Sequence, residues 1–278
     1  MTKRITIPLD APALARGVGF FETILVVRGA PVLLEAHWRR LASGAESLRF
    51  PAPPREAFER ENRSAASAIA AMPEASVRVS WLAIGIDVQD PRSWRLVSLS
   101  GPVPETTLRR RRRGRVIVLG NHIPRPTPGL KTVSYVPSVL GLREAHEKNA
   151  DEALFTDARG RILEGTTSNV FAVRDDVLIT PPVSAGLLPG VMRAWVIANA
   201  REAGFRVRER LLTRDDLVAG SFLTGSLTRI APIRFVDGER AALRGDACRA
   251  LAQLFEAEIR ALVAEASGVR ATARGRRH

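Results

Sequence analysis

Lysine is rare in this sequence, because only three of its 42 Lys and Arg residues are lysines. One of them, Lys131, lies in the run GLKTVSY between Gly129 and Tyr135. A lysine kept among apolar and hydroxyl residues suggests that its primary amine is needed, since a guanidinium stays protonated and is a poor nucleophile. A desolvated amine with a lowered pKa can form a Schiff base with a carbonyl compound. Lys131 is therefore a candidate catalytic residue, whereas we interpret Lys3 and Lys148 as surface lysines.

Three later segments provide groups that could bind one ligand. Glu164 precedes the small polar residues GTTSN, and a buried carboxylate there can keep a heteroaromatic nitrogen protonated. The segment LLPGVM at 187–192 opens a helix, whose free backbone N–H groups can bind phosphate. The hydroxyls and amides of TGSLT at 224–228 could complete a phosphate cradle, and Arg40 could add a charged contact. Taken singly, each has an ordinary alternative, namely a surface turn, a helix entry or a solvated arginine. An amine, a carboxylate and a phosphate cradle together are what pyridoxal 5′-phosphate requires.

Length and composition limit the class of protein that carries these groups. The 278 residues are enough for two modest domains or one large one, with 45% hydrophobic and 26% charged residues. We expect no membrane span, because no apolar run approaches about 18 residues. The single cysteine, Cys248, and an N-terminus without an apolar signal core predict a cytoplasmic protein. The four scattered histidines predict no metal site.

The net charge of +13 raises the question of a nucleic-acid partner. Five consecutive arginines, Arg109 to Arg113, carry much of the local charge, and we interpret them as a solvated turn. Aromatic residues are only 5% of the chain and none are interleaved with these arginines for base stacking. We therefore expect no nucleic-acid partner and keep a basic nucleic-acid-binding protein as a remote alternative.

Hydrophobic periodicity predicts alternating helices and strands, and hence an α/β fold. Three prolines and a glycine between Asn121 and Gly129 exclude regular structure there. We therefore predict a small N-terminal α/β domain at 1–120, a linker at 121–128 and a larger cofactor-binding domain at 129–278. The expected helices cover 35–48, 55–71, 136–149, about 13 residues from 191, and 246–266. The expected strands cover 4–9, 24–34 (a hairpin), 77–86, 94–100, 116–119, 152–163 (a hairpin), 169–180 (a hairpin), 205–211, 221–225 and 230–235.

Several motifs in this order resemble a known family from about Gly17 to Gly238. They are GVGFFET, EAHWRRL, LKTVSY, ADEALFTDARGRILEGTTSNVF, GLLPGVMR and FLTGSLTRIAPI. With them the chain resembles the class IV, or fold type IV, pyridoxal-phosphate enzymes, which include branched-chain aminotransferases, D-amino acid aminotransferases and aminodeoxychorismate lyases. The resemblance implies two α/β domains with the cofactor between them, and a homodimer whose partner completes the substrate pocket.

The resemblance also implies roles for individual residues. Lys131 would form the covalent bond to the cofactor and move protons, and Glu164 would pair with the pyridine nitrogen. Tyr135 would lie near the phenolic oxygen, in a loop one residue shorter than in branched-chain members. Met192 stands where many relatives have threonine, so a hydroxyl contact would be lost. The phosphate would be held by Arg40, Val191, Met192, Ser226 and Leu227.

The motifs do not distinguish between two reactions, because both use the same groups around the cofactor. We slightly favour a transaminase that moves an amino group between an amino acid, or amine, and a 2-oxo acid by a ping-pong mechanism. The alternative is a 4-amino-4-deoxychorismate lyase that releases pyruvate and 4-aminobenzoate. Candidate residues for the substrate carboxylate are Arg229, Arg16 and Arg92, because arginine can grip a carboxylate with two parallel bonds.

Overall fold

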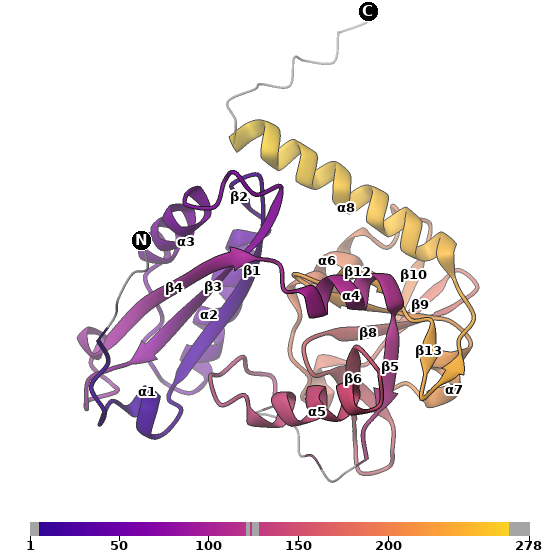
Figure 1. Ribbon diagram of the computed structural model, residues 1–278, viewed down its shortest axis with the longest axis horizontal. Helices are drawn as coiled ribbons and strands as arrows, with labels where there is room; N and C mark the ends of the chain where they lie inside the picture. Colours follow the sequence, from indigo (N-terminus) through magenta and orange to yellow (C-terminus); the bar gives the residue numbers. More distant parts are fainter. Residues whose placement is uncertain (1–5, 121–122, 124–127, 267–278) are drawn as a thin grey trace, which may run out of the picture.

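The computed structural model describes residues 6–120, 123 and 128–266, and its first part is a four-stranded antiparallel sheet. The strand order is β2-β1-β3-β4, and α2 and α3 lie on one face, to the left in Figure 1. The predicted hairpin forms around Arg28 and Gly29, although its first strand begins earlier than expected. The elements are α1 (Pro12–Ala15), β1 (Gly19–Val27), β2 (Ala30–Pro31), α2 (Leu34–Ser47), α3 (Arg55–Ser67), β3 (Glu74–Ala83), the short 3-10 helix η1 (Pro91–Ser93) and β4 (Trp94–Pro102).

Strand β3 shows why this sheet has two different faces. Its buried residues alternate with half-buried ones, as expected for a strand packed on one side. Val79 and Trp81 pack into the core with Leu41 of α2 and Phe58 of α3. The other face carries Arg78, which pairs in register with Thr23 of β1. This second face is turned away from α2 and α3.

The rest of the chain forms two five-stranded sheets that share a core. One has the order β10-β9-β8-β11-β12 and the other β14-β13-β5-β6-β7. Val116, Leu154, Val170 and Leu223 come from both sheets and lie in one buried cluster. The strands are β5 (Arg115–Val118), β6 (Glu152–Thr156), β7 (Ile162–Gly165), β8 (Asn169–Arg174), β9 (Val177–Thr180), β10 (Arg206–Glu209), β11 (Ser221–Gly225), β12 (Arg229–Pro232), β13 (Phe235–Val236) and β14 (Glu239–Arg240).

Helices cover these sheets, and one of them connects the two parts. Helix α8 crosses above both parts in Figure 1, packing on α6 and β12 and reaching β2. None of the described helices combines the length and the apolar composition of a membrane span. Thr213 caps α7, and its side chain accepts from the Asp216 N–H. The helices are α4 (Glu105–Arg113), α5 (Val136–Glu147), the 3-10 helix η2 (Val183–Ala185), α6 (Val191–Asn199), α7 (Arg214–Val218) and α8 (Gly245–Ala266).

The chain leaves the first sheet earlier than predicted. Strand β4 ends at Pro102, and β5 already pairs with β6 and β13 of the second part. Judged by which strands pair, the boundary between the two parts of the molecule lies near residue 103, inside the predicted domain 1–120. Most of the predicted linker 121–128 lies outside the described residues. The predicted strand 4–9 is partly outside them too, and residues 6–9 form no strand.

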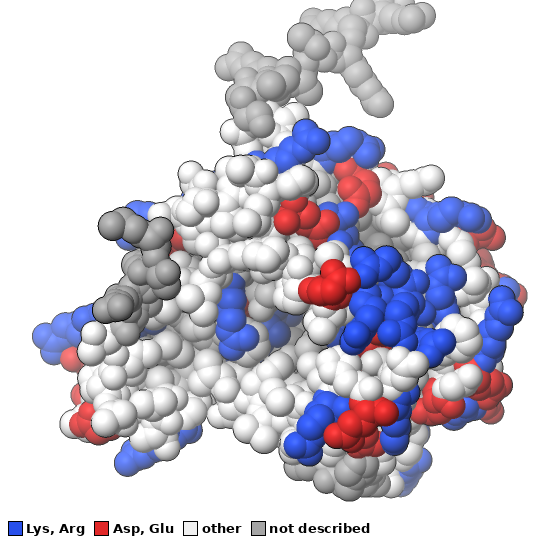
Figure 2. All heavy atoms as spheres, viewed as in Figure 1, with Lys and Arg blue, Asp and Glu red and all other residues white. Residues whose placement is uncertain are grey.

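The five arginines form a helix, which corrects the prediction of a solvated turn. They belong to α4, which ends at Gly114 with a positive φ of 57°. Arg110 is buried, and each of the five forms an ion pair, with Asp151, Glu152, Glu74 or Glu105. Figure 2 shows Lys and Arg atoms gathered over this region with acidic atoms beside them. The charge run is therefore built into the fold.

Candidate active site

Lys131 lies between the two parts of the molecule, held by backbone bonds to β1. The Phe21 N–H donates to the Lys131 carbonyl over 3.0 Å, and the Val133 N–H donates to the Gly19 carbonyl over 3.0 Å. Its amine lies 4.4 Å from the centre of the Phe21 ring and 5.8 Å from that of Tyr135. The segment after Gly129 thus extends the N-terminal sheet and fixes the amine at its edge.

The surroundings of Lys131 make its amine a stronger nucleophile at moderate pH. Burial lowers its pKa from 10.5 to about 8, and the positive charge of Arg40 contributes to the shift. Glu22 and Glu164 act in the opposite direction without reversing the shift. A substantial fraction of the amine is therefore neutral near pH 8, as covalent chemistry requires.

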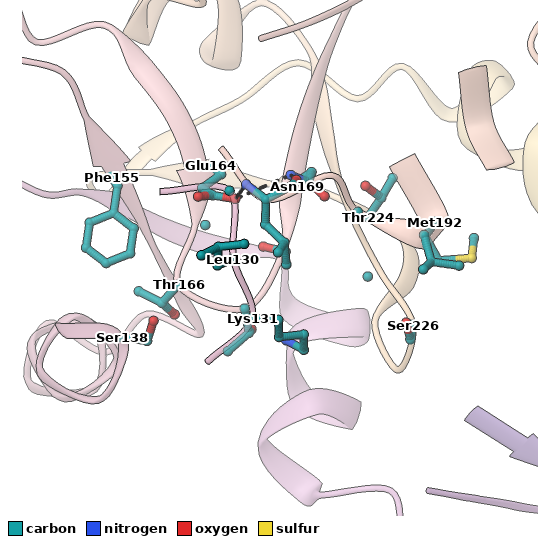
Figure 3. Close-up of a pocket in the computed structure, with 18 of the residues that line it drawn as sticks. Leu130, Lys131, Ser138, Phe155, Glu164, Thr166, Asn169, Met192, Thr224 and Ser226 are labelled. Atoms are coloured by element: carbon teal, nitrogen blue, oxygen red, sulfur yellow. Dashed lines mark hydrogen bonds between the residues drawn. The ribbon is translucent and has the colours of Figure 1, made fainter. Parts of the chain in front are cut away.

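Lys131 borders a pocket, shown in Figure 3. Glu164 lies at one end of this pocket, on β7 opposite Phe155 of β6. Its Oε2 accepts from the Leu188 N–H over 2.9 Å and from Asn169 Nδ2 over 3.5 Å. These bonds hold a buried carboxylate in one orientation at the pocket wall. There it can accept a hydrogen bond from a protonated ring nitrogen.

A second buried carboxylate, Glu152, fixes the loop after Glu164. It accepts from the hydroxyls of Thr166, Thr167 and Ser168, with Thr167 Oγ1 at 2.8 Å and Ser168 Oγ at 2.9 Å. Arg110 of α4 lies 3.4 Å from this carboxylate and also donates to Thr167 Oγ1 over 2.6 Å. The GTTS segment is therefore rigid, and Arg110 and Glu152 stabilise it.

The opposite end of the pocket is built from groups that suit a phosphate. Helix α6 begins after Gly190. The backbone of Gly190 lies so close to Asn169 that a Cβ at position 190 would lie only 1.8 Å from the Asn169 Oδ1. Val191 and Met192, at the helix start, line the pocket. Thr224 is fully buried, lines the same pocket, and its Oγ1 is among the buried polar atoms without a partner in the described part of the chain. A buried hydroxyl without a hydrogen-bond partner, in a pocket that also holds a helix N-terminus, suits an anionic ligand.

Ser226 and Arg40 lie beside the end of the pocket that suits a phosphate, and both belong to a buried hydrogen-bond network. Arg40 Nε donates to Glu22 Oε1 over 2.7 Å, and His37 Nδ1 lies 2.7 Å from Glu22 Oε2. The other ring nitrogen of His37 lies 3.3 Å from Ser226 Oγ. Arg40 also donates to the Pro189 carbonyl over 3.3 Å, just before α6. The network links α2 of the first part to Ser226 of the second.

The pKa values of Glu22 and His37 are set by burial and by the charged groups that contact them in this network. Burial would raise the pKa of Glu22, but Arg40 and His37 outweigh it and lower the pKa to about 2. Burial lowers the pKa of His37, although Glu22 opposes the shift. Glu22 is therefore ionised at neutral pH and His37 is neutral, so Arg40 carries the balancing charge.

Tyr135 lies next to Lys131, in the segment that begins α5. Its hydroxyl donates to the Thr166 carbonyl over 2.8 Å, and its ring meets Phe21 edge-on at 5.3 Å. Burial raises the pKa of the phenol to about 12, and nearby Glu152 adds to the shift. Tyr135 is thus a neutral hydroxyl at the pocket wall across the physiological range.

Lys131 also borders a second pocket. Figure 2 shows a hollow between the two parts of the molecule with Lys or Arg atoms inside it. Phe21, Thr23 and Arg78 from the N-terminal sheet form one wall. Residues of α4 and of the segment 226–228 form the opposite wall, and no Asp or Glu is among the described lining residues. The two pockets share Lys131, Tyr135, Thr167 and Ser226.

The structure brings most of the predicted cofactor residues together. Lys131, Tyr135, Glu164, Val191, Met192 and Ser226 all line the first pocket. Arg40 and Leu227 line the second pocket instead. Arg40 adjoins α6 through Pro189, whereas the Leu227 carbonyl accepts from Arg111 Nε over 2.8 Å.

The three arginines predicted for the substrate lie outside both pockets. Arg229 pairs with Glu74 and Glu256, so its charge is already balanced. Arg92 is 90% exposed and pairs with Asp90, and Arg16 is exposed at the end of α1. Within this single chain, none of the three arginines predicted to bind the substrate carboxylate therefore lines a pocket that contains Lys131.

Sequence reasoning overlooked five residues that build the site: Glu22, His37, Arg78, Arg110 and Glu152. Glu22 and His37 lay inside motifs quoted for their family resemblance, without a role. Arg78 lay on a strand whose alternating pattern marked its face as half-buried. Arg110 was hidden in the arginine run, where helical periodicity would have separated it from its exposed neighbours.

Comparison with known proteins identifies the family. The sequence profile of the class IV aminotransferases matches residues 19–236, so the chain belongs to this family of pyridoxal-phosphate-dependent enzymes. A bifunctional aminodeoxychorismate lyase and D-amino acid transaminase of Mycobacterium tuberculosis is 30% identical over 270 residues, covering 90% of this chain and 92% of that protein. The branched-chain-amino-acid aminotransferase of Pseudomonas aeruginosa is 38% identical over 109 residues, covering 38% of this chain and 35% of that enzyme. Three branched-chain relatives are covered over only 35% to 39% of their length.

Solved structures agree with this assignment. A hypothetical aminotransferase from Mycobacterium tuberculosis in a PLP-bound form has a TM-score of 0.83 at 28% identity, covering 93% of this chain and 95% of that chain. The branched-chain amino acid aminotransferase of Escherichia coli has a TM-score of 0.75 at 26% identity, covering 90% and 88%. The expected α/β architecture of fold type IV is therefore confirmed.

Proposed function

We propose that this enzyme is a transaminase that moves an amino group between an amino acid and a 2-oxo acid in two half reactions, by a ping-pong mechanism. The observation that supports this most is the position of Lys131, whose amine borders both pockets. The first pocket suits the cofactor and the second suits a substrate. An amine at their junction can move a proton between a substrate and a bound ring system.

The residues of the first pocket fit pyridoxal phosphate. When bound, this cofactor supplies an aldehyde and a ring that stabilises negative charge at the substrate Cα. Lys131 would hold it covalently and then act as the base at that carbon. Glu164 would keep the ring nitrogen protonated, because its carboxylate is oriented by Leu188 and Asn169.

The phosphate would lie at the start of α6. The N–H groups of Val191 and Met192 would donate to it, with the hydroxyls of Thr224 and Ser226. Arg40 would contribute mainly through its charge, since its guanidinium already binds Glu22. Tyr135 would lie near the ring oxygen, with its hydroxyl donating to the Thr166 carbonyl. The role of Leu227 is then to shape the substrate pocket, which it lines.

A lyase acting on 4-amino-4-deoxychorismate is the second candidate. It is supported by the bifunctional Mycobacterium tuberculosis relative, which the chain matches over 90% of its own length. Both reactions begin with removal of the same Cα proton, so Lys131 and Glu164 would serve in either. A homodimer in the cytoplasm remains our expectation for the state of the enzyme.

One experiment separates these reactions. The purified enzyme, loaded with pyridoxal phosphate, is given one amino acid at a time without a 2-oxo acid. A transaminase loses the visible absorbance of its bound cofactor and forms one equivalent of 2-oxo acid. A lyase keeps its absorbance and releases pyruvate from 4-amino-4-deoxychorismate. Stable absorbance with every L- and D-amino acid tested would contradict the transaminase proposal.

A further inference from the structure

A buried chain of hydrogen bonds joins Glu22 to Ser226 through His37. Glu22 is fully buried and His37 is 1% exposed. His37 Nδ1 lies 2.7 Å from Glu22 Oε2, and His37 Nε2 lies 3.3 Å from Ser226 Oγ. Because Glu22 is ionised and can only accept, the single ring hydrogen of neutral His37 lies on Nδ1. Nε2 is therefore an acceptor, and the Ser226 hydroxyl donates to it.

The proposed phosphate site requires the same hydrogen. Ser226 lines the first pocket together with Val191, Met192 and Thr224, where we propose that the phosphate lies. A serine hydroxyl has one hydrogen, so Ser226 cannot donate to His37 and to a phosphate at the same time. A bond from a hydroxyl to a phosphate anion is charge-assisted and strong, whereas the bond to His37 is long at 3.3 Å. The phosphate is thus the better acceptor.

Donation to the phosphate would leave the Nε2 of His37 without a partner. This nitrogen would then face the lone pairs of Ser226 Oγ in a buried site, which is unfavourable. A proton on Nε2 removes the conflict, because the new N–H can donate to Ser226 Oγ. The hydrogen bonds then run outward from the imidazolium, to Glu22 on one side and through Ser226 to the phosphate on the other.

The charges around His37 permit this protonation only with an additional anion. Among the described residues, the charged groups that act on it are Glu22 on β1, Arg40 on α2 and Lys131. Glu22 favours the charged ring, whereas burial and the two cations keep the pKa of His37 below 6.5. A phosphate ester adds between about one and a half and two negative charges near pH 7, on the same side of the balance as Glu22.

We infer that Ser226 turns its hydroxyl from His37 to the cofactor phosphate, and that His37 then takes up one proton from solvent at Nε2. The inference rests on the proposed function, in which the phosphate lies at the start of α6. Glu22 and His37 are then positioning residues, which orient Ser226 without touching the cofactor. Because a proton is bound together with the phosphate, affinity for a phosphate-bearing ligand falls as pH rises.

NMR can observe the protonation of His37 directly, because the chain has only four histidines. The cofactor-free enzyme, with isotope-labelled histidine, is given pyridoxamine 5′-phosphate or pyridoxamine, which lacks the phosphate. Neither has an aldehyde to react with Lys131. Spectra are recorded at about pH 7.5, where the phosphate is mainly a dianion. We expect the Nε2 signal of His37 to become that of an N–H with pyridoxamine 5′-phosphate alone, and an unprotonated Nε2 in that complex would overturn the inference.

The pH dependence of binding is the second measurement. From about pH 7 to 8, the preference of the wild type for pyridoxamine 5′-phosphate over pyridoxamine should fall by up to about tenfold per pH unit. His37→Gln cannot take up the proton, so its preference should change less with pH. The variant also accounts for Lys131, whose own protonation responds to the phosphate. His146→Gln, which removes an exposed histidine of α5, is the matched control and should behave as the wild type.

Equal pH dependence in the wild type and His37→Gln would overturn the inference. Thermal unfolding shows that the variant is folded, and the wild-type spectra do not depend on any variant. If pyridoxamine 5′-phosphate bound no more tightly than pyridoxamine, the proposed phosphate site would be wrong and the inference with it. Tighter binding with a neutral His37 would leave the proposed function standing and refute only the proton uptake.

Discussion

The two pockets that meet at Lys131 are built in different ways. The first pocket, proposed for the cofactor, has backbone N–H groups, small residues and a carboxylate that is fixed by Leu188 and Asn169. The second pocket, proposed for the substrate, has long cationic side chains from two separate parts of the fold. Two of its arginines show the contrast, because Arg110 is fully paired and Arg78 is not. Paired charges stabilise the fold, whereas an unpaired one is available to a ligand.

Lys131→Ala should have the largest effect, because it removes the amine that both pockets share. We expect transamination to fall by more than about 10³-fold, since a positioned base and nucleophile is lost. The measurement is the rate at which cofactor absorbance changes after an amino acid is added. Lys148→Ala is the control and should be unaffected, because Lys148 is 57% exposed and pairs with Glu144.

Arg110→Met should lower the free energy of unfolding of the enzyme. It leaves the buried carboxylate of Glu152 without its cation, and breaking a buried pair costs about 3–5 kcal/mol. Denaturant unfolding measures the change in free energy. Arg112→Met, which removes a 61% exposed neighbour on the same helix, should change stability little. A stable Arg110 variant would show that this arginine does not hold the GTTS loop.

The pH dependence of cofactor attachment should reflect the lowered pKa of Lys131. Only the neutral amine attacks the aldehyde, so the rate in the apoenzyme should rise as pH increases and level off above about 8. A pKa near 8 implies an increase of about 50-fold from pH 6 to pH 8 and only about twofold beyond. Stopped-flow absorbance at a series of pH values gives the midpoint. A midpoint near 10.5 would mean that the amine is not desolvated.

Arg78→Met should have the smallest effect on stability and completes the comparison with Arg110→Met. Loss of the contact with Phe21 costs about 1 kcal/mol, and relief of the unpaired charge offsets part of it. We expect the free energy of unfolding to stay within about 1 kcal/mol of the wild type. A loss comparable to that of Arg110→Met would make Arg78 a structural residue.

The same contrast explains what could be predicted from the sequence. Lys131, Glu164 and the start of α6 could be predicted as candidate site residues because each is marked by neighbours within a few positions. Arg78 was missed because its position beside Lys131 depends on the pairing of β3 with β1, which brings it opposite Thr23 across 55 positions of sequence. No local pattern contains that register. Most helices and strands were predicted within a few residues for the opposite reason, since periodicity is local.

Two features of the fold depend on contacts between segments that are distant in sequence. The run Arg109–Arg113 looked solvated because its acidic partners, among them Asp151 and Glu152, are distant in sequence. The division between the two parts was placed at the proline-rich segment, whereas β5 had already joined the second part through β6. Ion pairs and strand partners between distant segments decide both features, and neither is visible in composition.

The central claim, that Lys131 carries the cofactor, is tested most directly by the site of covalent attachment. The enzyme is saturated with pyridoxal phosphate, reduced with borohydride, digested and analysed by peptide mass spectrometry. We predict a single pyridoxyl adduct, on the peptide that contains Lys131. An adduct on Lys3 or Lys148 instead, or none in cofactor-saturated enzyme, would contradict the roles of both pockets.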